Sequence, residues 1–142
     1  MGARTRRGQA NESRGERACA ATDPQVKAFG RQTVTAHMGV NKSATELVTK
    51  SKVTPEDNAT SVSLKSGGEQ NVKSLEQLHG AAFDKAYIDL EVAYHQQVLD
   101  VVDKTLIPGA RNADLKALLV KVRPAFVAHL EHAQHLQMTL GK

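Results

Sequence analysis

The chain has 142 residues, of which 40% are hydrophobic and 24% are charged, and its formal net charge is +4. One cysteine excludes a disulfide framework or a cysteine-rich zinc module, and no apolar run reaches the roughly 18 residues that a membrane-spanning helix needs. Aromatic residues make up only 4% of the chain, with no tryptophan, which leaves little material for stacking nucleic-acid bases.

The positive charge is concentrated in residues 1–22, where five arginines and two glutamates leave a net +3. Residues 23–142 carry 14 basic and 13 acidic side chains, so this part is close to neutral. A basic stripe across a folded domain is typical of nucleic-acid binding, and its absence here predicts no nucleic-acid partner. We expect a basic N-terminal segment, residues 1–22, as a short helix or without regular structure, and a helical domain over residues 23–142. The N-terminal segment lacks the long apolar centre of a secretory signal.

Asp23 and Pro24 predict the start of a first long helix, because aspartate is a favoured N-cap and proline fits the first helical position. We expect this helix to continue to about Lys52, before Pro55. Its inward residues recur at spacings of three and four, which is the helical period. They are Val26, Gly30, Thr33, His37, Val40, Ala44 and Leu47.

Residues 54–70 are polar and rich in glycine and serine, which predicts a connector. A second long helix is predicted from Val72 to Leu106, because Pro108 and Gly109 form a strong stop. Its inward stripe again has helical spacing and comprises Asp84, Ile88, Glu91, His95, Val98 and Val102, with Phe83, Tyr87, Leu90 and Tyr94 on a neighbouring face.

A third long helix follows a short turn, and Pro124 inside it is expected to produce a kink because proline removes one helical hydrogen bond. The inward stripe comprises Leu115, Leu119, Val122, Phe126, His129, Ala133, Leu136 and Leu140. Three long helices, with a weak or incomplete first helix in residues 8–22, predict an all-α up-and-down bundle.

Three histidines occupy stripe positions where apolar residues are expected: His37, His95 and His129. Imidazoles on three helices can point into a bundle, where such proteins hold metals and cofactors. Glu91 lies one turn before His95 on the same face, so both can ligate one ion. Asp84 lies two turns before Glu91. The candidate ligands of a transition metal such as Zn, Cu or Fe are therefore these five residues.

The register between the last two helices bears on which of these residues can meet. Antiparallel pairing about Pro108 places His129 opposite Ile88 and His95 opposite Val122. At 1.5 Å per residue, this separates the two histidines by roughly 10 Å. We therefore expect His129 to pair with Asp84 or Glu91 rather than with His95. His37 is an alternative partner for His95.

The competing interpretation is that these histidines only form hydrogen bonds in the core, as buried polar groups must. A catalytic di-iron centre is not predicted, because it needs two Glu-x-x-His motifs and the chain has one, Glu76 to His79. His132 and His135 are expected to face solvent. The sequence contains no nucleophile motif, and no enzymatic activity is expected.

Three motifs carry a resemblance: Asp23-Pro24-x-Val26-Lys27-Ala28-Phe29, Leu78-x-Gly80-Ala81-Ala82-Phe83-Asp84-x-x-Tyr87, and Pro124-x-x-x-x-His129-Leu130. They resemble the bacterial family catalogued as domain of unknown function 4142, over residues 23–137. The resemblance implies a ferritin-like four-helix bundle in the periplasm or outer membrane. We expect a non-enzymatic envelope protein that binds a metal ion or small ligand. The alternative is a structural or stress-related interaction protein. A homo-oligomer is compatible with either, and no partner protein is indicated.

Overall fold

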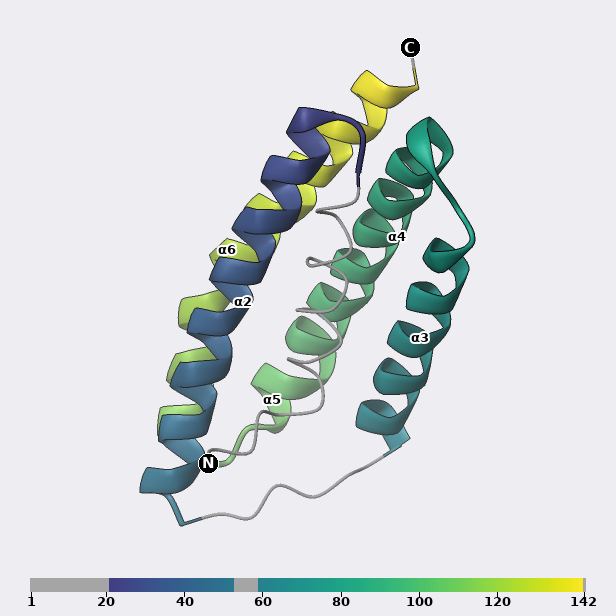
Figure 1. Ribbon diagram of the computed structural model, residues 1–142. Coiled ribbons are helices and arrows are strands. Elements are labelled where there is room, and N and C mark those ends of the chain that lie inside the picture. Colours follow the sequence, from purple (N-terminus) through teal and green to yellow (C-terminus); the bar gives the residue numbers. More distant parts are fainter. Residues whose placement is uncertain (1–20, 53–58, 142) are drawn as a thin grey trace. The chain divides into compact units, whose positions relative to one another are not determined.

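The computed structural model describes residues 21–52 and 59–141, and these ranges contain helices and no strand (Figure 1). The predicted all-α fold is therefore confirmed, whereas the helix expected in residues 8–22 falls almost wholly outside the described residues. The helices are α2 (Pro24–Lys50), α3 (Ala59–Glu76), α4 (Gly80–Val101), the π-helical turn η2 (Val102–Leu106), α5 (Ile107–Gly109) and α6 (Ala113–Leu140).

The chain divides into two compact units, Met1–Asp84 and Lys85–Lys142, with the boundary inside α4. Unit 1 contains α2, α3 and the first turn of α4. Unit 2 contains the rest of α4 together with η2, α5 and α6. In the described part of the chain, no helix combines the length and the apolar character needed to cross a membrane.

Helix α2 of unit 1 begins where the sequence predicts, because Asp23 caps it. The Asp23 carboxylate accepts hydrogen bonds from the amides of Gln25 and Val26, at 2.7 and 3.4 Å. The first half of the predicted inward stripe is buried, together with one residue that the stripe omits, Phe29. The second half of the stripe is only half-buried. The helix ends at Lys50, two residues before the predicted end.

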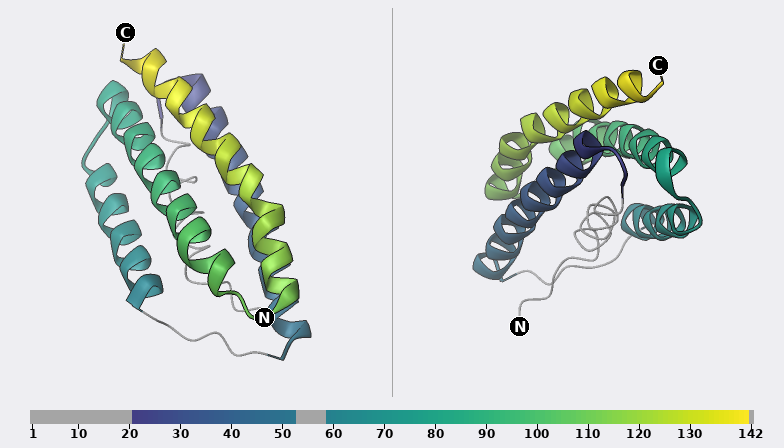
Figure 2. Two further views of the ribbon diagram at one scale, coloured as in Figure 1. Left: turned by 180° about the vertical axis from the view of Figure 1, so that it is seen from behind. Right: turned by 45° about the horizontal axis from the view of Figure 1, so that its top comes forward.

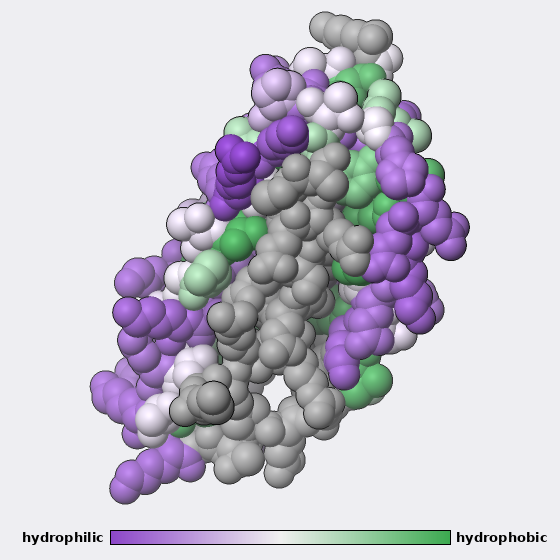
Figure 3. All heavy atoms as spheres, viewed as in Figure 1, coloured by the Kyte–Doolittle hydropathy of each residue, from purple (hydrophilic) through white to green (hydrophobic). Residues whose placement is uncertain are grey.

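Helix α3 shows that the predicted connector over residues 54–70 is wrong for residues 59–70. Leu64, Gly68 and Leu75 are buried at helical spacings of four and seven residues, while the opposite side carries exposed charged residues such as Glu69 and Lys73. Figure 3 shows hydrophilic side chains gathered over α3. Few large apolar residues mark the inward face, so the glycine and serine content concealed the helix.

The predicted continuous helix from Val72 to Leu106 is also wrong, because the helical conformation is interrupted between the end of α3 and the start of α4. The amide of Leu78 donates to the carbonyl of Leu75 and closes the last turn of α3. Gly80 then adopts a φ of 62°, in the left-handed region that glycine reaches without steric cost. The break therefore depends on one glycine, and a new helix starts from it.

In unit 2, α4 and α6 lie side by side and antiparallel, joined through η2 and α5 (Figure 2). Asp89 accepts a hydrogen bond from Gln137 at 2.8 Å. Nearer the turn, Arg123 donates two hydrogen bonds to the Asp103 carboxylate, at 2.6 and 2.7 Å. Both pairs place the midpoint of the helical hairpin near Asn112.

The predicted register between these helices is therefore wrong by several residues. Pairing about Pro108 assumed that the second helix ends at Leu106, but helical structure continues through η2 and α5 to Gly109. Helix α6 starts only at Ala113, where the side chain of Asn112 caps it by accepting the Leu115 amide at 3.0 Å. The longer turn moves the hairpin midpoint toward the C-terminus.

Helix α6 runs without interruption past Pro124. Its buried residues are His129, Ala133 and Leu136, all in the second half of the predicted stripe. Leu115, at the beginning of that stripe, is 40% exposed. The predicted inward face of α6 is thus confirmed only for the part that contains His129.

Candidate metal-binding histidines

Helix α4 brings Glu91 and His95 together one turn apart, and their side chains are 1% and 0% exposed. The Nδ1 atom of His95 lies 2.8 Å from the backbone carbonyl oxygen of Glu91. A carbonyl oxygen can only accept a hydrogen bond, so Nδ1 must carry the proton. The lone pair of the neutral ring is then on Nε2, the nitrogen that can bind a metal.

The carboxylate of Glu91 lies close to the same nitrogen, with its Oε2 atom 3.4 Å from Nδ1 of His95. Histidines that ligate metals almost always donate their other ring N–H to a carboxylate or a backbone carbonyl. In this structure the backbone carbonyl of residue 91 accepts the hydrogen bond from Nδ1, and the carboxylate lies close to the same atom. This is an arrangement that holds a ring in one orientation and one tautomer.

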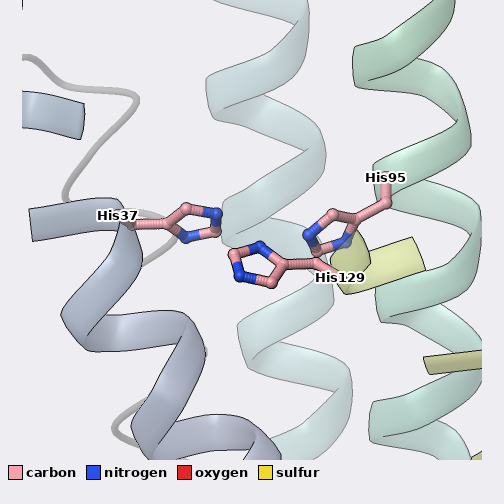
Figure 4. A group of neighbouring side chains, drawn as sticks. All are labelled: His37, His95 and His129. Carbon is pink, nitrogen blue, oxygen red and sulfur yellow. The ribbon is translucent and has the colours of Figure 1, made fainter. Parts of the chain in front are cut away.

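His129, on α6, lies next to His95. The rings of His95 and His129 stand edge to face, with their centroids 5.7 Å apart and their planes at 89°. Figure 4 shows the two rings next to each other, and one ring nitrogen of each lies within 4.8 Å of the other. Two nitrogens on one zinc ion are at most about 4.2 Å apart, and about 3.4 Å in tetrahedral geometry. Small side-chain rotations would therefore suffice for shared coordination.

The predicted separation of roughly 10 Å between these histidines is consequently wrong. The expectation rested on pairing α4 and α6 about Pro108, and the longer turn through η2 and α5 invalidates it. His129 lies beside His95 and not opposite Ile88. The histidines that the sequence separated are the two that unit 2 brings together.

The surroundings of His129 favour a neutral imidazole. Burial lowers the pKa of His129 below its ordinary value of 6.5, and the nearby rings of His95 and His132 lower it further. Phe126 and Tyr94 also flank His95, with ring centroids at 6.3 and 5.8 Å. An uncharged imidazole keeps its lone pair available for a metal, and an apolar wall restricts access of water.

His37, the third side chain drawn in Figure 4, belongs to unit 1 and lies near the middle of α2. It is buried, one turn after Thr33, whose hydroxyl donates to the carbonyl of Phe29 at 2.7 Å. Its predicted place on the inward face of α2 is confirmed.

Asp84 accepts backbone hydrogen bonds near the start of α2, a role that the sequence did not predict. Its two carboxylate oxygens accept hydrogen bonds from the amides of Thr22 and Asp23, at 2.9 and 2.8 Å. Since Asp23 in turn caps α2, Asp84 ties the start of α4 to the start of α2 within unit 1. A contact between residues so far apart in sequence leaves no local signal.

The predicted ligands thus fall into two groups. Glu91, His95 and His129 come from unit 2, where Glu91 contacts His95 and His95 contacts His129. His37 and Asp84 belong to unit 1. Of the two histidines expected to face solvent, His135 is exposed, as predicted, whereas His132 is half-buried.

A family model described as a domain of unknown function, DUF4142, matches residues 15–136. No curated protein and no solved structure matches the chain. The match covers most of the chain and includes all five predicted ligands. The chain therefore belongs to the DUF4142 family.

Proposed function

We propose that this protein binds a divalent transition-metal ion through buried imidazoles, with His95 and His129 as its core ligands. The observation that carries the proposal is the contact between these two rings in unit 2, with ring nitrogens within 4.8 Å. Two adjacent buried imidazoles offer a cation two lone pairs, whereas a purely hydrophobic core would place apolar side chains there.

The donor atoms define the class of metal. Imidazole nitrogens suit Zn²⁺, Cu²⁺ and Fe²⁺, whereas Mg²⁺ and Ca²⁺ prefer oxygen ligands. Tetrahedral zinc sites take four ligands, so two histidines do not complete one. We leave His37 out, because it belongs to unit 1, whereas His95 and His129 belong to unit 2. We leave Asp84 out, because both its oxygens already accept backbone amides.

We further propose that the protein acts by binding rather than catalysis, and that it does so in a ferritin-like bundle within the bacterial envelope. The support for the fold type and the location is the resemblance of the motifs around Asp23, Gly80 and Pro124 to the family. Fractionation of the native host, with antibodies against the untagged protein, tests the location.

Metal binding is tested by thermal melts and calorimetric titrations of untagged, chelator-treated protein with Zn²⁺, Cu²⁺ and Fe²⁺, with Mg²⁺ as the control ion. A ligand that binds only the folded state stabilises it, by about 2.7 kcal/mol at a concentration of 100 Kd. We expect this stabilisation for at least one transition metal and not for Mg²⁺.

The matched variants are His129→Gln and His135→Gln, which remove a buried and an exposed histidine from the same helix. Only the first should weaken metal binding. If no transition metal stabilises the protein, or if both variants bind as the wild type does, the histidines are core residues with a structural role and the proposal is wrong.

A further inference from the structure

Glu91 is the buried acidic residue nearest to the proposed ligands in unit 2. It is 1% exposed, and acidic side chains are almost never fully buried without a partner. Its carboxylate Oε2 lies 3.4 Å from Nδ1 of His95, and its backbone carbonyl lies 2.8 Å from the same atom. One residue thus contacts one ring nitrogen in two ways.

The geometry of the imidazole separates this contact from the proposed metal. The Nδ1–H bond and the Nε2 lone pair of a histidine point to different sides of the ring. Since Glu91 lies on the Nδ1 side of His95, a cation bound at Nε2 would have Glu91 behind its ligand and outside its coordination sphere. The sequence pattern alone could not make this distinction, because residues one turn apart can also ligate one ion together.

We infer that Glu91 is a positioning residue for the metal site: it holds the ring of His95 so that Nε2 faces the ion, and its charge offsets that of a cation bound among neutral imidazoles. This inference rests on the proposed function. Partners of this kind raise the basicity of the ligand, and their loss typically reduces metal affinity 10–100-fold.

The test compares zinc affinity in Glu91→Gln, which keeps the size of the side chain and removes its charge, with that in Asp100→Asn. Asp100 lies on the same helix, is 68% exposed and pairs with Lys104, so the control removes the same charge at a solvated position. We expect zinc affinity to fall roughly 10–100-fold in Glu91→Gln and to stay unchanged in Asp100→Asn.

Co²⁺ absorption then separates positioning from ligation. If Glu91 only positions His95, the bands of bound Co²⁺ keep the same wavelengths in wild type and Glu91→Gln, although saturation needs more metal. Shifted bands in the variant would make Glu91 a ligand and would overturn the inference. Melting curves of the metal-free variant show whether it is folded at the titration temperature, so that lost affinity is not mistaken for unfolding.

A variant-free measurement covers the case in which Glu91→Gln does not fold. Nitrogen-15 spectra of the metal-free wild type should show His95 protonated at Nδ1, and a proton on Nε2 would overturn the inference. A wild type that binds no metal rejects the proposed function and this role together. A wild type that binds zinc no better than Glu91→Gln rejects the role of Glu91 alone.

Discussion

His95 and His129 stand edge to face across α4 and α6, with ring centroids 5.7 Å apart. The contact depends on where the helical hairpin turns, because a midpoint near Pro108 would separate the two rings and the observed midpoint near Asn112 brings them together. In a buried site, protonating two adjacent imidazoles is energetically unfavourable, because burial and like charge both disfavour the charged form. This relationship therefore affects the response of the protein to acid as well as its affinity for metal.

The metal-free protein should lose stability as the pH falls below about 6.5. Burial, followed by the nearby His95 and His132, lowers the pKa of His129 from 6.5. The unfolded chain then binds this proton before the folded one, so acid favours unfolding from pH 6.5 down to the lower folded pKa, and stability returns as the pH rises.

Urea titrations in chelator, at pH values from about 7.5 to about 5, measure this loss. His129→Gln removes the titrating group and should flatten the pH dependence, whereas the exposed His135→Gln should leave it as in the wild type. An equally steep dependence in His129→Gln would assign the effect to another group.

Asp84→Ala should destabilise the protein by about 2–3 kcal/mol, because it removes the acceptor of two backbone amides beside the start of α2. Asp100→Ala, at an exposed position on the same helix, should change stability by no more than about 0.5 kcal/mol. The free energy of unfolding in urea gives both values. Zinc affinity of the folded Asp84→Ala protein should equal that of the wild type, and a large drop would instead make Asp84 a ligand.

Local signals explain which parts of the fold the sequence could predict. Asp23 and Pro24 mark the start of α2 because capping involves only neighbouring residues. Helix α3 escaped prediction because Gly67 and the adjacent glycine suggested a connector, while its inward face holds only a few large apolar residues. The break before α4 depends on the backbone angle of Gly80, and a glycine in a sequence does not say which angle it adopts.

For the candidate site, too, the sequence predicted which side chains are buried but not which of them are in contact. Helical periodicity correctly placed His37, His95 and His129 on inward faces, because the period reports which side of a helix is buried. Their partners depend on the register between helices, and the register depends on a turn whose π-helical segment has no clear sequence pattern. The mutual contact of His95 and His129 therefore became visible only in three dimensions.

Gly80 and Gly67 should respond to alanine with opposite signs. Gly80 has a φ of 62°, and a Cβ there meets nothing within 4 Å, so Gly80→Ala should cost about 1–2 kcal/mol through backbone strain alone. Gly67 lies inside α3 with open space around its Cβ position, so Gly67→Ala should stabilise the protein by about 0.5–1 kcal/mol. Urea unfolding measures both, and destabilisation by Gly67→Ala would contradict the helical conformation of α3 at that residue.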